Sequence, residues 1–250
     1  MRRILVVAGA ALLLSSAALA QNAPKPSGYL PAGALDPASF LPPFPAPGSA
    51  AEALDKAGYA PVPVGSPRWE QAKADDDLKQ LAHNFRCAVG VELTPQNAPA
   101  LLNAVERAFV DADAVVAKAK ALYPRDRPFE TDPNPEAPYC LSAPRERVAA
   151  SPSYPSGHGT NGYLFSLMLA ESAPDRAGQL IARGRDFGDS RIACRVHHPS
   201  DIQAGQLVAT ALFARLQAEP AFRADMDKAR AEVAAARAAA KAPPQGCPAA

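Results

Sequence analysis

The stretch PSGHGTNGYLFSLMLAE, residues 155–171, decides the class of fold because it passes from serine and glycine into a long apolar run. Within residues 159–171, Leu164 stands three positions before Leu167 and four before Met168. This spacing places the three side chains on one face of a helix. The stretch therefore predicts a helix with that face buried in a core.

The start of the same stretch is suited to an anion. Ser156, Gly157 and His158 stand directly before the helical pattern. The first N–H groups of a helix have no partner within it, and together with the helix dipole they attract negative charge. Glycine lets a ligand approach the backbone closely because it has no side chain. The sequence therefore predicts a cradle for a phosphate-like group here.

Helical periodicity recurs along most of the chain. Further helices are predicted over residues 68–88, 94–122, 175–189, 199–219 and 220–241. In the second of these, Thr94 is expected to cap the helix and Pro95 to occupy its first turn. No segment alternates convincingly between apolar and polar residues, as a half-buried strand would. The predicted fold class is all-α, in a single compact helical domain.

The N-terminus has the pattern of a secretory signal peptide. A start with two arginines is followed by an apolar run over residues 4–14 and by Ala-Leu-Ala at 18–20. The run is shorter than the roughly 20 residues that a membrane helix needs. We expect residues 1–20 to be cleaved as a signal peptide, which leaves a periplasmic or secreted protein without a membrane anchor. A retained anchor is the alternative.

The charge of the chain is nearly balanced. Its formal net charge is +1, and acidic and basic residues are interspersed. This pattern argues against a nucleic-acid-binding surface and against an acidic tail. Any binding of anions must therefore be local.

The cysteines indicate disulfides. Cys87, Cys140, Cys194 and Cys247 form an even set in a chain that we expect to reach an oxidising compartment. Their spacing leaves three pairings open, of which we favour Cys140 with Cys194 and Cys87 with Cys247. No two of them stand close enough in the sequence to suggest a zinc site.

Groups that bind phosphate gather in three short stretches, residues 120–128, 155–158 and 190–201. Arg127 and Arg191 can each form bidentate hydrogen bonds to phosphate oxygens, and Lys120 adds a compact positive charge. Each of these residues alone is more often a solvated surface charge. Their joint occurrence with a helix start predicts a phosphoryl group as the ligand.

A histidine and an aspartate four positions apart, His197 and Asp201, stand where a helix is predicted to begin. The carboxylate can accept a hydrogen bond from one imidazole nitrogen and fix the tautomer, which leaves the other nitrogen as a directed nucleophile. His158 is a second histidine, able to donate a proton. A helix-start interaction without chemistry is the alternative.

Together these stretches resemble the signature of the phosphatidic acid phosphatase type 2 superfamily, Lys-x6-Arg-Pro, Pro-Ser-Gly-His and Ser-Arg-x5-His-x3-Asp. Every position is present: Lys120, Arg127, Pro128, Pro155, Ser156, Gly157, His158, Ser190, Arg191, His197 and Asp201. Most of the mature chain is similar to soluble bacterial class A non-specific acid phosphatases, which are exported helical proteins of about this size. Gly159 and His198 differ from the residues common beside the signature, and residues 57–64 lack an arginine-containing pattern of that class.

The resemblance implies an acid phosphatase that hydrolyses small-molecule phosphate monoesters and can also pass phosphate to alcohols. His197 resembles the nucleophile that becomes a phosphohistidine, Asp201 the carboxylate that orients it, and His158 the acid for the leaving group. The residues implied to bind the phosphate are Lys120, Arg127, Ser156, Gly157 and Arg191. No metal ion and no other cofactor is expected, and relatives of this kind lead us to expect a homo-oligomer.

Three other functions use similar residues. A vanadium-dependent haloperoxidase would hold vanadate in the same cluster, but such enzymes are generally much longer. A phosphate-binding protein without turnover would need no nucleophile, orienting carboxylate or acid. A lipid phosphate phosphatase would be favoured by an exposed apolar patch beside the pocket. Within the leading interpretation, His198 is the alternative nucleophile, three residues before Asp201.

The chain divides by composition into four parts. Residues 1–20 are the expected signal peptide, and residues 21–67 form a segment rich in proline and alanine that cannot be one long helix. We expect that segment to wrap over the surface, with a disordered linker as the alternative. Residues 68–241 form the predicted helical catalytic domain, and residues 242–250 a C-terminal tail.

Overall fold

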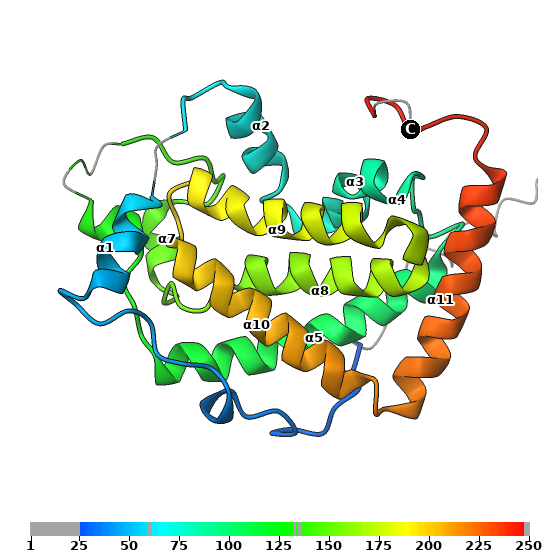
Figure 1. Ribbon diagram of the computed structural model, residues 1–250, viewed down its shortest axis with the longest axis horizontal. Helices are drawn as coiled ribbons and strands as arrows, with labels where there is room; N and C mark the ends of the chain where they lie inside the picture. Colours follow the sequence, from blue (N-terminus) through cyan, green and yellow to red (C-terminus); the bar gives the residue numbers. More distant parts are fainter. Residues whose placement is uncertain (1–25, 60–61, 133, 135–136, 248–250) are drawn as a thin grey trace, which may run out of the picture.

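The computed structural model describes residues 26–59, 62–132, 134 and 137–247, and these contain helices but no strand (Figure 1). The expected all-α class is confirmed. The predicted signal peptide, residues 1–20, lies outside the described residues. The longer helices are α1 (Ala50–Ala57), α2 (Pro67–Ala74), α5 (Pro99–Leu122), α8 (Gly157–Ser172), α9 (Ala177–Ala193), α10 (Pro199–Leu216) and α11 (Pro220–Ala239). The short ones are η2 (Pro37–Ser39), η3 (Leu78–Gln80), α3 (Leu81–Asn84), α4 (Arg86–Val89), α6 (Pro128–Thr131), α7 (Arg145–Ala149) and η4 (Pro174–Arg176).

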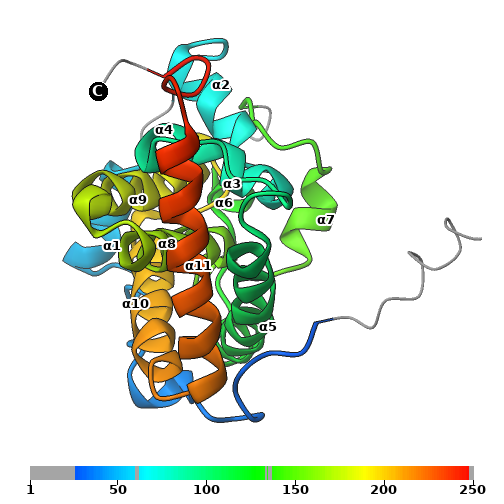
Figure 2. The ribbon, with the colours of Figure 1, turned by 90° about the vertical axis from the view of Figure 1, so that its right-hand side faces the viewer.

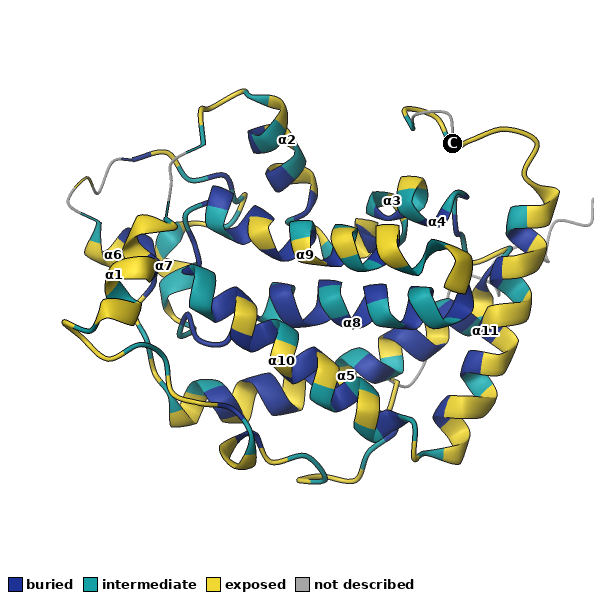
Figure 3. Cartoon of the chain, viewed as in Figure 1, coloured by how far each residue is buried: buried dark blue, intermediate teal, exposed yellow. Residues whose placement is uncertain are grey.

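Helix α8 is the centre of the bundle. It packs against α9 and α10, and also touches α5 and α11. Its residues are buried or intermediate along its whole length, whereas α11 carries an exposed outer face (Figure 3). The end-on view shows α11 crossing the end of the bundle beside α5 and α10 (Figure 2). The predicted buried helix of residues 159–171 is therefore the one on which the other long helices assemble.

Two glycines allow the helices to approach α8 closely. A Cβ on Gly162 of α8 would lie 2.2 Å from a ring carbon of Phe187 on α9. A Cβ on Gly205 of α10 would lie 2.7 Å from the carbonyl oxygen of Ser156. Since neither distance is compatible with a side chain, these glycines bring α9 and α10 against the central helix. The absence of a side chain on Gly205 also allows α10 to lie against the start of α8.

Two of the predicted helices are wrong in extent. Residues 68–88 form α2, η3, α3 and α4 in succession, because Asp77 accepts a hydrogen bond from the N–H of Lys79 at 2.9 Å and starts a new turn after α2. The helix expected from Thr94 begins at Pro99 instead. The N–H of Thr94 donates to Oδ1 of Asn97 at 2.7 Å, so this stretch forms a turn.

The segment before residue 68 contributes to the core and to the network described below. Leu41 is buried beside Val208 of α10, in a cluster that also includes Val116 of α5. The N–H groups of Tyr29 and Leu30 donate to the carboxylate of Asp111, at 2.8 and 3.2 Å. This segment also contains α1, which carries the buried Asp55.

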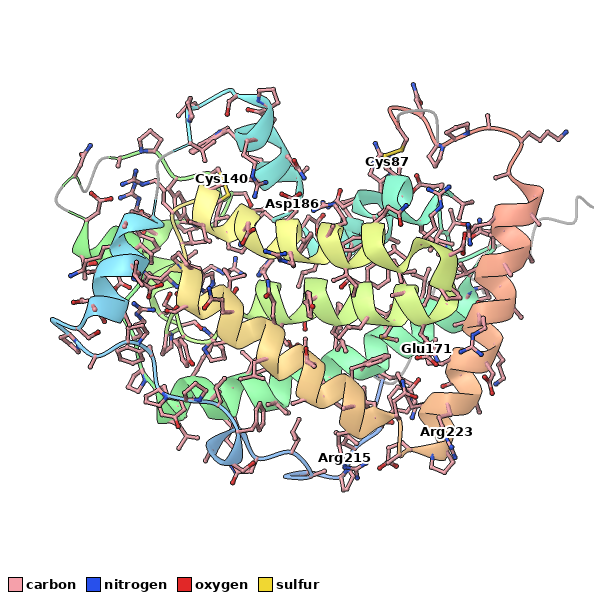
Figure 4. All side chains as sticks on the ribbon, viewed as in Figure 1. Cys87, Cys140, Glu171, Asp186, Arg215 and Arg223 are labelled. Atoms are coloured by element: carbon pink, nitrogen blue, oxygen red, sulfur yellow. A yellow bond between two sulfur atoms is a disulfide. The ribbon has the colours of Figure 1, made fainter. Side chains whose placement is uncertain are left out.

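Two disulfides join distant parts of the chain, Cys87 with Cys247 and Cys140 with Cys194 (Figure 4, which labels Cys87 and Cys140). These are the pairings that we favoured. The first ties the segment after α11 to α4, and the second ties the loop before α7 to the end of α9. Within the described residues, no helix combines the length and the apolar character that crossing a membrane requires.

Candidate active site

Four helix ends meet at one end of the bundle, on the left in Figure 1, where α8 and α10 begin and α5 and α9 end. The helix starts carry His158 and Asp201, and the helix ends carry Lys120 and Arg191. Helix N-termini attract anions, whereas helix C-termini favour cationic side chains. The starts of α8 and α10 contribute partial positive charge here, and the ends of α5 and α9 contribute the cationic side chains of Lys120 and Arg191.

A cavity of about 410 Å³ opens between these helix ends. Six of the eight predicted site residues line it: Lys120, Arg127, Gly157, His158, Arg191 and His197. The other two, Ser156 and Asp201, are fully buried beside it. Ser156 caps α8, since its Oγ accepts a hydrogen bond from the N–H of Gly159 at 3.0 Å. The structure thus brings the predicted residues together, with Ser156 shaping the helix start and not lining the cavity.

Arg191 presents hydrogen-bond donors that no described residue uses. Its side chain is 2% exposed, and its Nε and Nη1 are buried without a partner among the described residues. Burial lowers the pKa of this guanidinium, although Asp76 acts in the opposite direction. A buried unpaired donor costs free energy, on the order of 1–3 kcal/mol. A ligand in the cavity that offers acceptors, such as phosphate oxygens, would therefore relieve this cost.

Arg127 and Lys120 add two more cationic groups. The Nε of Arg127 donates to the carbonyl oxygens of Val148 and Ser151, which fixes the guanidinium at the cavity wall. Burial lowers the pKa of Arg127 to about 10, so it stays charged at neutral pH. Burial and the neighbouring Arg127 lower the pKa of Lys120 to about 7. The charge of Lys120 therefore depends on pH in the neutral range.

His197 is held in one orientation by its neighbours. Its Nδ1 lies 3.3 Å from Oδ2 of Asp201, while its Nε2 faces Nη1 of Arg127 at 3.2 Å. An arginine can only donate, so Nε2 must be the unprotonated acceptor in this contact and Nδ1 carries the proton. Burial lowers the pKa of His197 well below its ordinary value, although the hydrogen bond that Nδ1 donates to Asp201 acts in the opposite direction. The result is a neutral imidazole at the cavity, with an unprotonated Nε2 whose electron pair accepts a hydrogen bond from Arg127.

Asp201 is fixed by more groups than His197. Its Oδ2 accepts from Oγ of Ser153 at 2.5 Å and from the N–H of His198 at 2.8 Å, and its Oδ1 accepts from Nη1 of Arg125 at 2.7 Å. Burial alone would raise the pKa of Asp201, but the contacts with His197 and Arg125 lower it below its ordinary value. Asp201 is therefore a buried carboxylate that stays ionised.

The network extends to a helix near the N-terminus. The Nη2 of Arg125 donates to Oδ2 of Asp55 at 2.8 Å, and Asp55 also accepts from Ser200. Sequence reasoning missed Arg125, Asp55 and Ser153. Arg125 could have been noticed, because it is a third cation two residues before Arg127. No local pattern marks Asp55, whose partners stand 70 and 145 residues away.

His158 and His198 differ in their relation to the cavity. The Nε2 of His158 lies 3.0 Å from the carbonyl oxygen of Asp76, and burial and Arg191 lower its pKa to about 3. His198 lines a different cavity, together with Tyr59 and Arg195. Its Nδ1 has no hydrogen-bond partner among the described residues. The geometry therefore favours His197 over His198 as the group that faces the phosphate.

The comparisons with known proteins agree with this arrangement. A model of the PAP2 superfamily matches residues 104–219, which include all eight predicted site residues. The chain is 38% identical to the acid phosphatase of Zymomonas mobilis over 213 residues, which are 83% of this chain and 79% of that protein. It is 36% identical to the non-specific acid phosphatase of Salmonella typhimurium over 199 residues, 78% of each chain. It is 32% identical to the non-specific acid phosphatase of Providencia stuartii over 206 residues, which are 80% of this chain and 82% of that protein. With relatives this similar over most of its length, and with most of the predicted site residues gathered at one cavity, the chain belongs to the PAP2 superfamily.

Proposed function

We propose that the chain is an acid phosphatase that hydrolyses small-molecule phosphate monoesters through a phosphohistidine formed on Nε2 of His197. The names of its relatives support the activity. The observation that carries the mechanism is the position of His197, with Nδ1 against Asp201 and Nε2 toward the cavity beside Arg127. A directed nucleophile, an orienting carboxylate and clustered cations are what phosphoryl transfer through a covalent intermediate needs.

In the first step, the electron pair on Nε2 of His197 attacks phosphorus and the bond from phosphorus to the ester oxygen breaks. The leaving oxygen takes a proton from His158, which becomes neutral. The substrate itself helps to protonate His158, because a phosphate dianion at the cavity raises the pKa of a histidine that burial and Arg191 had lowered. The products of this step are an alcohol and the phosphohistidine.

In the second step, His158 accepts a proton from water as the oxygen attacks phosphorus. The bond from phosphorus to Nε2 breaks, inorganic phosphate forms, and His197 recovers its electron pair. Throughout both steps, Arg127 and Arg191 stabilise the charge on the phosphoryl oxygens. Because these cations and Lys120 lie at the cavity, we propose that turnover needs no metal ion. An alcohol that replaces water would receive the phosphate, so we propose phosphotransferase activity as a side reaction.

The site of action is part of the proposal. We propose that the protein is exported to the periplasm or beyond, as the pattern of residues 1–20 predicts and as its two disulfides favour. We also expect it to assemble from several copies of the chain.

The test is hydrolysis of p-nitrophenyl phosphate in excess EDTA, followed by a rapid quench with radiolabelled substrate. We expect turnover that resists EDTA, and a labelled protein whose label is lost in acid but kept in alkali, as a phosphoramidate bond requires. A folded protein that shows no turnover would contradict the phosphatase proposal. Halide oxidation with added vanadate, or activity confined to lipid phosphates, would then identify the alternative.

The pH dependence gives a separate prediction for Lys120. With a pKa of about 7, this lysine loses its charge as the pH rises, so phosphate binding weakens. We expect kcat/KM to fall through about pH 7, since this ratio reports groups of the free enzyme. In the Lys120→Arg variant the cation persists, so the fall should move to higher pH. An identical pH profile in the two proteins would show that another group is responsible.

A further inference from the structure

The cavity contains one acidic side chain among its cations. Of the described residues that line it, Asp76 alone carries a carboxylate. Asp76 lies between the end of α2 and the start of η3, next to Asp75 and Asp77. The mechanism proposed above uses none of these three aspartates, so the presence of Asp76 at a site for anions needs an explanation.

Asp76 contacts two of the residues that the reaction uses. Its Oδ1 accepts a hydrogen bond from Nη2 of Arg191 at 3.0 Å and lies 3.9 Å from Nε2 of His158. Its backbone carbonyl lies 3.0 Å from the same Nε2. The Asp76 side chain is 21% exposed, whereas that of Arg191 is 2% exposed. The arginine is therefore fixed, while the carboxylate has open space on the side of the cavity.

Asp75 shows how a structural aspartate in this region is bound. It is fully buried, pairs with Arg183, and accepts from Oγ of Ser190 at 2.7 Å. None of Asp75, Arg183 and Ser190 lines the cavity. Asp75 can therefore anchor the loop to α9 by itself. The contact between Asp76 and Arg191 is not needed for that purpose.

A phosphate that binds Arg191 through two parallel hydrogen bonds must use Nη2 together with Nε or with Nη1. Because Nη2 already donates to the carboxylate of Asp76, the phosphate would lie close to that carboxylate. Two negative groups at such a distance repel each other, by about 1 kcal/mol in water and more where water is excluded. The carboxylate must then turn away from Arg191 and lose its hydrogen bond. Phosphate therefore binds less tightly than it would without the charge of Asp76.

We propose that Asp76 competes with phosphate for Arg191 and so sets the affinity of the site for both substrate and product. The inference rests on the proposed function. Among the described residues, four cationic side chains line the cavity: Lys120, Arg127, Arg147 and Arg191. Without a counter-charge they would hold inorganic phosphate tightly and delay its release. Asp76 replaces the departing phosphate on Arg191, which favours release and keeps the guanidinium in place for the next substrate.

The test compares Asp76→Asn with Asp77→Asn. Asparagine keeps the size of the side chain and the backbone carbonyl that His158 contacts, but it removes the charge. Asp77 is a matched control, because it is an exposed neighbour that does not line the cavity. We expect Asp76→Asn to lower the Ki of inorganic phosphate and the KM for p-nitrophenyl phosphate by roughly tenfold. The control should change neither by more than about twofold.

A purely structural role for Asp76 predicts the opposite sign. In that case, loss of order around Arg191 would raise both Ki and KM. Raised values would overturn the proposal, and so would values within twofold of the wild type. Calorimetric titration with inorganic phosphate measures the same affinity without turnover. It tests Asp76 even if the wild type hydrolyses no monoester, an outcome that would count against the proposed function alone. If circular dichroism shows that the asparagine variant is unfolded, Asp76→Ser removes the same charge.

Discussion

Replacing His197 by alanine is expected to lower the turnover of phosphate monoesters by at least about a thousandfold. The substitution removes the only imidazole whose unprotonated nitrogen faces Arg127 within the described part of the cavity. The cations that bind phosphate remain, so the affinity for inorganic phosphate should change much less than kcat. The rate of p-nitrophenyl phosphate hydrolysis and the Ki of phosphate, measured on the same preparations, check both expectations.

His198→Ala is the matched control for this prediction. It removes the adjacent imidazole, which lines another cavity beside Tyr59, while its backbone N–H to Asp201 is retained. We expect His198→Ala to lose no more than about tenfold in turnover. The reverse pattern, with the larger loss in His198→Ala and label still trapped on His197→Ala, would identify His198 as the nucleophile.

Replacing Arg125 by methionine should have the largest effect on stability, a loss of about 3–5 kcal/mol in the free energy of unfolding. Arg125 is 9% exposed and lies between two carboxylates, Asp55 at 4% and Asp201 at 0%. Methionine leaves both negative groups buried without their shared cation. The turnover of the folded fraction should also fall, roughly 10–100-fold, because Asp201 would no longer hold His197 in place. Urea unfolding and steady-state kinetics measure the two effects.

Three further variants separate the ion network from a general loss of packing. Arg185→Met changes an exposed arginine on α9 and should alter the free energy of unfolding by less than about 0.5 kcal/mol. Asp55→Asn removes one of the two carboxylates that Arg125 neutralises. The double variant Asp55→Asn with Arg125→Met should therefore be less unstable than the sum of the single variants. Additive losses would show that the two residues do not act as a pair.

Local sequence patterns were sufficient for the fold class and for most of the cavity. The spacing of Leu164, Leu167 and Met168 depends only on the period of a helix, and such a pattern is visible in any single stretch. Most of the residues that line the cavity with phosphate-binding chemistry were predictable for a similar reason. Arg127, Arg191 and His197 stand beside helix ends. A few neighbouring residues in the sequence are enough to indicate where each helix begins or ends and which side chain lies there. The boundaries of the helices were less predictable, because Asp77 and Asn97 bind nearby backbone N–H groups and restart or delay a helix.

The sequence by itself therefore determined that this protein is helical, that it carries the signature residues of the PAP2 superfamily, and which histidine stands four residues from an aspartate. Only the tertiary structure decided which charges meet. Asp55 reaches Arg125 across 70 residues, and Asp76 reaches Arg191 across 115. No period or motif encodes such contacts, since they arise when separate helices pack at distances that glycines such as Gly162 and Gly205 permit. The proposed nucleophile and its aspartate are thus specified locally, whereas the contacts of Arg125 with Asp55 and of Arg191 with Asp76 are specified by packing.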